Sequence, residues 1–363
     1  MNLVAIKSAI DALSAPTISF TILTVIFPFI FPPSDWFEKI HRKTGLWRMW
    51  TKPGGLIGMI LITAFFVIGY FDVYFNKTLT KADNFPIVLM IYSMWFLIWL
   101  GMYKAYRNDI RIEQGLKPEE YNDPDDKVLV WPDLVYIEFI ALILFQVFLI
   151  VWSILVAAPI EEPANPAATP NPSKAPWYFL GLQEMLVYYD PWIAGVLLPT
   201  FIIVGLMAIP YLDINKKGDG YYSFKERRVG IFIFMYGWVV LWLFLIIIGT
   251  FFRGPNWNFF GPFEYWDTHK VEALTNVNLS EILWVKWLNQ GMPSNILLRE
   301  SLGFILTGLY LFVLPVILAK TYLKDMLDAY GPTRFVTLMI LGLIMLALPI
   351  KMYLRWIFNL QYI

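Results

Sequence analysis

Long apolar runs alternate with short polar segments along the whole chain. About 20 consecutive apolar residues reach across the hydrocarbon core of a bilayer as a helix, and eight runs approach or exceed this length. They lie at about 16–33, 54–75, 85–106, 130–158, 191–212, 229–252, 301–322 and 334–358. The pattern predicts an all-α polytopic membrane protein with about eight transmembrane helices.

The first run is short and contains Pro28 near its end, which predicts a kink or an early stop of the helix. A run so close to the N-terminus also has the character of a signal peptide. Apolar residues continue beyond Ala15, however, so we expect the segment to be retained as a helix of the protein.

Positive charges alternate between the loops on the two predicted faces. Of the 28 lysine and arginine residues, 18 fall in the first, third, fifth and seventh loops. Loops rich in positive charge stay on the cytoplasmic side of a membrane. We therefore expect these four loops to face the cytoplasm and both termini to lie on the outer side.

The composition supports a membrane protein and excludes other classes. Hydrophobic residues make up 58% of the chain and charged residues 15%, against about 25% charged residues in soluble domains. A soluble multidomain enzyme is therefore excluded. Basic and acidic residues both number 28, so no net positive field attracts nucleic acid, and we expect no nucleic-acid partner.

The chain offers few ligands for redox cofactors. It contains no cysteine, so it can hold neither an iron–sulfur cluster nor a covalently attached c-type haem. Its two histidines are His41 and His269, and the predicted topology puts them on opposite sides of the membrane. Because a bis-histidine haem in a membrane needs two facing imidazoles, we expect no haem, iron–sulfur or other metal site in this chain.

A proline-rich stretch at 159–176 is expected to form an extended excursion on the outer face. Pro176 then begins a short amphipathic helix, too short to span the membrane, that we expect to lie in the outer interface. Trp177, Leu180 and Glu184 share one face of this helix, which places a carboxylate beside apolar side chains. Another short interfacial helix is predicted in the aromatic sixth loop.

Several motifs point to one protein family. They are Trp131-Pro132-Asp133 at the start of the fourth span, Glu161-Glu162-Pro163-Ala164-Asn165-Pro166 after it, Pro176-Trp177-Tyr178, and Phe251-Phe252-Arg253-Gly254-Pro255 at the end of the sixth span. On these motifs, the run from Val130 to about Arg253 resembles the C-terminal half of cytochrome b, which stands alone as subunit IV in cytochrome b6f-type complexes. The resemblance implies that the fourth, fifth and sixth spans correspond to helices E, F and G of that family.

The resemblance divides the chain into three parts. Residues 1–127 form an N-terminal three-helix membrane extension, and residues 128–253 form the cytochrome b C-terminal-like module. Residues 254–363 add an outer aromatic loop and two further transmembrane helices. Because the stand-alone family subunit has only the three middle helices, the resemblance assigns no role to either flanking part.

In this family the loop between helices E and F carries a Pro-Glu-Trp-Tyr motif that lines the outer quinol-oxidation site. The aligned residues here are Ala175, Pro176, Trp177 and Tyr178, so the motif glutamate is missing. The resemblance implies Pro176, Trp177 and Tyr178, with the nearby Leu180, as quinol-binding residues. Glu184 is the candidate proton acceptor in place of the missing glutamate, although its position also fits a solvent-facing charge.

Two more acidic residues lie at the start of the fourth span. Asp133 and Glu138 are ionisable groups at the edge of or within a membrane segment, where such groups are functional candidates. Glu138 fits an ion pair with a neighbouring subunit equally well.

The resemblance implies a haem-free, subunit IV-like component of a bacterial quinol:cytochrome c oxidoreductase in the inner membrane, inactive on its own. Such a component helps to form the outer site, at which quinol oxidation is coupled to proton release. Quinol or quinone binds there at a site shared between subunits. The implied partners are a diheme cytochrome b N-terminal-type subunit, Rieske iron–sulfur and/or c-type cytochrome subunits, and lipids.

Two other functions fit the same composition. The first is a cofactor-free membrane anchor of another quinone-linked respiratory or photosynthetic complex, and a diheme b subunit that purifies with the chain would distinguish the two hypotheses. The second is a transporter. Transporters usually have inverted repeats, broken helices or polar groups at mid-membrane, and the sequence contains few such features.

Overall fold

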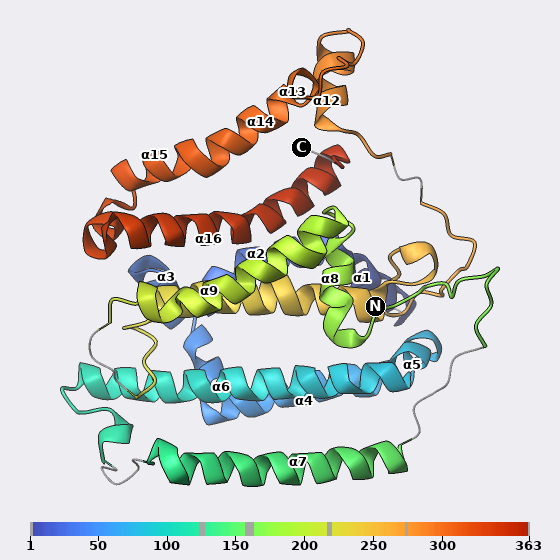
Figure 1. The fold of residues 1–363 in the computed structure, drawn as a ribbon. Helices are drawn as coiled ribbons and strands as arrows, with labels where there is room; N and C mark the ends of the chain where they lie inside the picture. Colours follow the sequence, from blue (N-terminus) through green and yellow to red (C-terminus); the bar gives the residue numbers. More distant parts are fainter. Residues whose placement is uncertain (1–2, 123–127, 157–162, 216–219, 273–274, 362–363) are drawn as a thin grey trace. The chain divides into compact units, whose positions relative to one another are not determined.

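The computed structural model describes residues 3–122, 128–156, 163–215, 220–272 and 275–361. Most of these residues are helical, and the only β-structure among them is two isolated β-bridges (Figure 1). Among them, seven helices are long and apolar enough to cross a membrane: Lys52–Tyr70, Ala82–Glu113, Val130–Leu155, Ile193–Leu212, Arg228–Phe252, Ser301–Lys320 and Lys324–Phe358. These helices confirm an all-α polytopic membrane protein and coincide with seven of the eight predicted spans.

The first predicted span has a different form. α1 (Leu3–Ser14) and α2 (Pro16–Ile30) meet at a bend of 74°. Pro16 lacks the N–H that a continuous helix would bond to the preceding turn, so the chain changes direction there. The 15 residues of α2 measure about 22 Å, less than the roughly 30 Å of a hydrocarbon core. The bent pair supplies the eighth span only if both helices count as one.

The helices form two compact units, each assembled from separated parts of the chain. Unit 1 contains Met1–Phe27, Lys174–Gly218 and Ile233–Ile363, and unit 2 contains Pro28–Ser173 and Asp219–Phe232. The three sequence parts, 1–127, 128–253 and 254–363, follow the family resemblance rather than the contacts, so that division stays a prediction. Its first boundary lies outside the described residues.

Unit 2 contains five α-helices within its described residues: α3 (Asp35–Lys43), α4 (Lys52–Tyr70), α5 (Val73–Leu79), α6 (Phe85–Glu113) and α7 (Val135–Leu155). α4 and α6 run antiparallel and side by side (Figure 1). The short α5 turns the chain between them, with Asp72 as its N-cap. α7 carries no buried residue, so its apolar side chains face outward on all sides.

Two glycines of α4 receive two indole rings of α6. A Cβ atom on Gly55 would lie 2.2 Å from the ring of Trp99, and one on Gly58 would lie 2.0 Å from the ring of Trp95. The indole N–H of Trp95 donates to the carbonyl of Gly55 at 3.0 Å, and that of Trp99 donates to the carbonyl of Thr51 at 2.8 Å. Close packing and hydrogen bonds therefore join these helices. Inside a bilayer these are the forces available, because the lipid tails are as apolar as the side chains and the hydrophobic effect does not drive helices together.

The C-terminal end of α6 binds the segment 220–228, which precedes the sixth span in sequence. The buried carboxylate of Asp109 accepts hydrogen bonds from the hydroxyl of Ser223 at 2.7 Å and from the N–H groups of Phe224 and Lys225 at 3.1 and 3.2 Å. The adjacent Asn108 is 1% exposed, and its side-chain amide donates to the backbone carbonyl of Tyr222 in the same segment at 2.9 Å. α6 is thus tied to the segment that leads into the sixth span.

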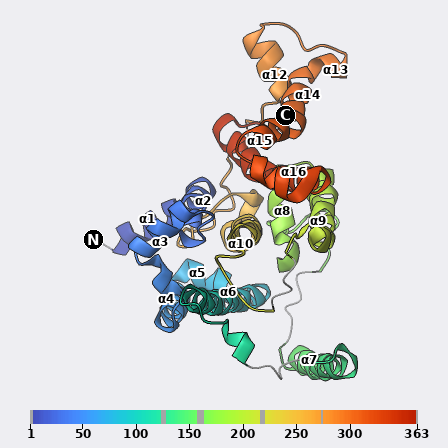
Figure 2. The same ribbon diagram turned by 90° about the vertical axis from the view of Figure 1, so that its left-hand side faces the viewer.

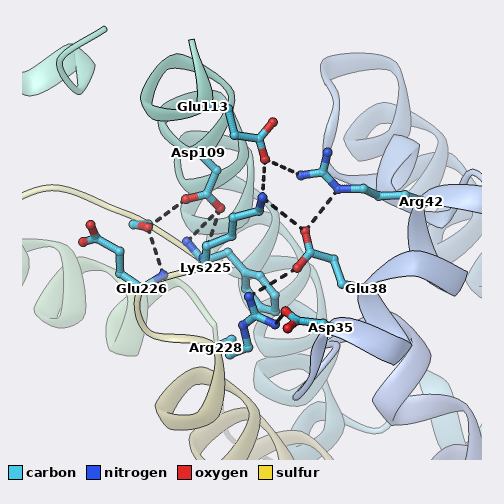
Figure 3. A network of polar contacts seen from close by, with 10 residues as sticks. Asp35, Glu38, Arg42, Asp109, Glu113, Lys225, Glu226 and Arg228 are labelled. Atoms are coloured by element: carbon cyan, nitrogen blue, oxygen red, sulfur yellow. Dashed lines mark hydrogen bonds and ion pairs between the residues drawn. The ribbon is translucent and has the colours of Figure 1, made fainter. Parts of the chain in front are cut away.

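Charged side chains surround this connection (Figure 3). They join α3, α6 and the segment 220–228 through ion pairs, which are Lys225–Glu113, Lys225–Glu38 at 3.6 Å, Arg42–Glu113 at 2.9 Å, Arg42–Glu38 at 3.1 Å, Arg228–Asp35 at 2.5 Å and Arg228–Glu38 at 3.4 Å. Most of these groups are partly exposed, so each pair contributes about 0–1 kcal/mol. The buried Asp109 therefore fixes the geometry, and the surface pairs reinforce it.

Unit 1 contains the shorter helices α8 (Leu180–Met185), α9 (Leu198–Leu212), α11 (Phe244–Ile247), α12 (Leu279–Glu281), α13 (Ile296–Arg299), α14 (Ser301–Gly308) and α15 (Leu314–Lys320), and the long α16 (Lys324–Phe358). The span Arg228–Phe252 begins as α10 (Arg228–Met235) in unit 2 and enters unit 1 at Ile233. α16 lies beside α9 and α15 (Figure 2). The hydroxyl of Tyr310, between α14 and α15, donates to the carbonyl of Leu343 of α16 at 2.6 Å.

The long α16 is interrupted near its start. Gly331 has a φ of 73°, in the left-handed region that favours glycine, and Pro332 follows it. The predicted eighth span, 334–358, begins just after this break, so the two residues mark where the membrane helix starts.

Aromatic contacts set the direction of three helices in unit 1. The ring of Phe20 in α2 lies 5.4 Å from that of Phe244, and Phe27 lies 5.5 Å from Tyr236, so α2 runs antiparallel to the span Arg228–Phe252. Phe20 also lies 5.7 Å from Trp356, near the C-terminal end of α16. The start of α2 and the ends of the other two helices therefore meet at one end of unit 1, which we call the terminal end.

We expect Gly58→Ala to lower the free energy of unfolding by about 2 kcal/mol, because the added methyl group would enter the ring of Trp95. Gly101→Ala in α6 is the matched control, since its Cβ would have no heavy atom nearer than 3.8 Å and alanine favours a helix. Thermal unfolding of the purified protein in detergent, followed by circular dichroism, would measure both. Equal stability of the two variants would contradict the close packing of α4 on α6.

Candidate functional site

The segment after the proline-rich stretch is anchored by the two residues that precede Pro176. The ammonium group of Lys174 donates to the carbonyl of Thr250 at 2.7 Å, near the end of the sixth span. The backbone N–H of Ala175 donates to Oε1 of Gln183 at 2.8 Å. These contacts hold the start of a 3-10 turn, Trp177–Phe179, which continues into α8.

α8 packs against the last turns of the span Arg228–Phe252, because two glycines let the backbones approach. A Cβ atom on Gly249 would lie 3.2 Å from the carbonyl oxygen of Leu180, and one on Gly181 would lie 3.2 Å from the side chain of Ile246. Leu180 is 3% exposed as a result. The short interfacial helix predicted from the sequence is thus fixed to a membrane-spanning helix.

Glu184 lies in this contact and is 0% exposed. Arg253 donates from Nε to one carboxylate oxygen at 2.9 Å and from Nη2 to the other at 2.6 Å, so the ion pair is bidentate. The indole N–H of Trp257 adds a third hydrogen bond at 3.1 Å. Burial by itself would lower the pKa of Arg253, but the attraction and hydrogen bonds of Glu184 outweigh burial and raise the pKa. Arg253 therefore remains a cation inside the protein.

A tight turn brings Arg253 and Trp257 together. Nη1 of Arg253 donates to the carbonyl of Trp257 at 2.9 Å. Asn256 and Trp257 both have a φ of 58°, a left-handed conformation that costs about 1–2 kcal/mol per residue for side chains other than glycine. A Cβ atom on Gly254 would lie 2.6 Å from the ring of the buried Phe260. The surrounding contacts therefore hold this turn in a strained shape.

The N-terminal helix packs against the same loop. Asp11 of α1 accepts a hydrogen bond from the backbone N–H of Phe263 at 2.8 Å, and the ammonium group of Lys7 lies 5.4 Å from the centre of the Phe263 ring. A Cβ atom on Gly261 would lie 2.4 Å from the carboxylate of Asp11. α1 therefore covers part of the loop that carries Arg253 and Trp257.

The predicted quinol-binding residues fall into two groups. Pro176 is exposed, Tyr178 is 50% exposed, and the half-buried Trp177 contacts the Tyr178 ring edge-on at 5.7 Å between ring centres. Phe179 is 49% exposed beside them. We call Pro176, Trp177, Tyr178 and Phe179 the aromatic surface. Leu180, by contrast, is buried where α8 packs against Gly249.

Glu184 lies apart from the aromatic surface. Its full burial excludes the solvent-facing position that its sequence context also allowed. Both carboxylate oxygens are already bonded to Arg253 and Trp257, so the pair must open before Glu184 can accept a proton. The role of proton acceptor stays a prediction for such an opened state.

Asp133 and Glu138 belong to unit 2, at the start of the span Val130–Leu155, and both are exposed. Within the part of the chain that the structure describes, neither side chain has an ion-pair partner. Pairing of Glu138 with a neighbouring subunit therefore stays a prediction, as does a functional role for either acid.

The two histidines have contrasting surroundings. His41 is 0% exposed, its Nδ1 lies 2.7 Å from the carbonyl oxygen of Phe29, and burial lowers its pKa. His269 is exposed. Across the described ranges, no three side chains of His, Cys, Asp or Glu are grouped to hold a metal ion. That the chain binds no haem stays a prediction.

The sequence motifs include Arg253 only as one residue of a run, and they do not include Trp257. Charge offered a signal, because Arg253 is a lone cation at the end of an apolar span and Glu184 is a lone acid in an apolar segment. Buried charges require partners. The two residues are nevertheless far apart in sequence, so the pairing itself needed the fold.

We expect Glu184→Gln to lower the free energy of unfolding by about 3 kcal/mol, because it leaves the buried Arg253 cation without a counter-charge. Glu264→Gln is the matched control: Glu264 pairs with Lys270 at 3.3 Å but is 41% exposed, so its loss should cost at most about 1 kcal/mol. Unfolding of both variants in detergent would be compared with that of the parent protein. If the two changes cost the same, the pair does not hold α8 in place.

Comparison with known proteins supports the resemblance stated from the motifs. Residues 163–263 match the family model described as cytochrome b (C-terminal)/b6/petD. The match begins after the fourth span and extends past Arg253 to Phe263, so Trp131-Pro132-Asp133 lies outside it. No solved structure matches the chain. The matched segment, which holds α8, the aromatic surface and the Glu184–Arg253 pair, is therefore similar to the C-terminal part of cytochrome b.

Proposed function

We propose that this chain is a haem-free, subunit IV-like component of a bacterial quinol:cytochrome c oxidoreductase, and that its terminal end borders the outer quinol-oxidation site. One observation carries the proposal. The region that matches the cytochrome b C-terminal family, residues 163–263, contains both the aromatic surface and the ion pair that fixes it. In this proposal the exposed aromatic surface contacts the quinol, and the buried Glu184 holds α8 in position.

The aromatic surface suits a quinol ring. Tyr178 and Phe179 are each about half exposed, and aromatic faces bind flat apolar rings by packing. Ligand sites bury most of their ligand, so a surface of this kind requires a second wall. In the proposal, a diheme cytochrome b N-terminal-type subunit supplies that wall and the quinol site is shared between the two chains.

The buried ion pair positions the surface. Glu184 joins α8 to Arg253 and Trp257, and through them to the loop at the end of the sixth span. A rigid wall lets the quinol head be held in one orientation while electrons leave to a Rieske iron–sulfur or c-type cytochrome partner. Because Pro176 stands where the family motif has glutamate, the proton leaves either through a partner's group or through Glu184 after its pair with Arg253 opens.

Co-purification tests the proposal directly. The tagged chain, extracted from native membranes in mild detergent, should carry b-type haem in stoichiometric amount through a partner, seen in a reduced-minus-oxidised spectrum, and should oxidise quinol with cytochrome c as acceptor. A haem-free assembly, or one whose redox partner lacks b haem, would instead support the membrane-anchor hypothesis.

In that assembly we expect Tyr178→Ala to raise the quinol KM roughly fivefold with a smaller change in kcat, because a packing contact made equally before and during the reaction is lost. Trp287→Ala is the matched control, since Trp287 is 69% exposed but lies outside residues 163–263. Steady-state kinetics over a range of quinol concentrations would distinguish the two. An unchanged KM for Tyr178→Ala would remove the aromatic surface from the site.

A further inference from the structure

The loop before the seventh span contains a groove of about 590 Å³ in unit 1. It lies outside residues 163–263, so neither the family match nor the proposed function accounts for it. Its apolar lining includes Met292, Ile296 and Phe304, and its polar lining includes Asn278, Arg299 and Glu300. A groove of this volume accommodates a ligand of moderate size.

The groove lies where a polar loop meets a membrane helix. Arg299 and Glu300 directly precede the apolar span Ser301–Lys320, and Phe304 and Thr307 lie about 5–9 Å further along it at 1.5 Å per residue. Charged groups at one end and apolar groups toward the bilayer match a ligand with a polar head and an apolar tail. A phospholipid at the membrane surface has this division.

The polar groups of the groove carry both charges. Arg299 donates from Nε to Oε1 of Glu300 at 2.8 Å, and its backbone carbonyl accepts from the indole N–H of Trp284 at 3.0 Å, which fixes its position. The side chain of Asn278 caps the first turn of α12 by facing the backbone N–H of Glu281, so it is already engaged. The groove therefore offers one cation and one anion, which together favour a ligand with a phosphate and an N–H donor.

We propose that this groove binds the headgroup of phosphatidylethanolamine. The terminal guanidinium nitrogens of Arg299 hold the phosphate, while the carboxylate of Glu300 accepts hydrogen bonds from the ammonium group. Ile296 and Phe304, 59% and 57% exposed, contact the first carbons of the acyl chains. The near-zero net charge of the groove disfavours a purely anionic lipid, and the Glu300 carboxylate disfavours a choline headgroup, which has no N–H to donate to it.

Lipid retention by the full-length protein tests this site. Native mass spectrometry from detergent would compare phosphatidylethanolamine, phosphatidylglycerol and phosphatidylcholine with identical acyl chains. We expect phosphatidylethanolamine to bind at least about fivefold more tightly than either other lipid, the discrimination of a single partly exposed charged contact. Arg299→Gln should weaken phosphatidylethanolamine about fivefold, and Glu300→Gln should remove its advantage over phosphatidylcholine.

Lys286→Gln is the matched control, because Lys286 is an exposed cation of the same loop that does not line the groove. Circular dichroism would establish that every variant is folded. Equal retention of the three lipids by the parent protein would overturn the proposal, and so would unchanged retention in Arg299→Gln. Tight retention of an added quinone that phosphatidylethanolamine does not displace would also overturn it. Since the readout is lipid retention, the result is independent of quinol turnover.

Discussion

The bidentate pair between Glu184 and Arg253 is the interaction on which the terminal end of unit 1 depends. Removing two charges from water costs several kcal/mol per ion, and only good geometry with additional hydrogen bonds repays that cost. Here Trp257 supplies the additional donor, and the strained turn that presents it is held in shape by the same contacts. Replacing either Glu184 or Arg253 alone with a neutral residue would leave the other as a buried charge without a counter-charge.

In this arrangement, different side chains hold the backbone in place and present a surface to a ligand. Glu184 and Arg253 are buried, whereas Tyr178 and Phe179, just before α8, are about half exposed. A site wall built in this way keeps its backbone position when a ligand or a neighbouring subunit arrives. The N-terminal helix adds a further support, because α1 is bonded to the Arg253 loop through Asp11.

Seven spans could be predicted from the sequence because bilayer thickness alone sets the length of an apolar run. The bend at Pro16 was harder to predict, since a proline near a helix start is compatible with both a continuing and a redirected chain. The spacing of Leu180 and Glu184 correctly put them on one face, yet periodicity cannot tell a face that lines a cavity from one that packs on another helix. Arg253 became Glu184's partner only through the fold, as did the groove at Arg299.

The brevity of α2 has a consequence for the lipid around it. Its outward side chains, such as Val25 at 59% exposure, cover about 22 Å of apolar height, whereas neighbouring helices reach the full thickness of a bilayer. Lipids beside a short helix compress their chains, at a cost of a fraction of a kcal/mol per ångström of mismatch. We therefore expect the bilayer to be thinner next to α2, with polar headgroups closer to the membrane midplane there than beside the longer helices.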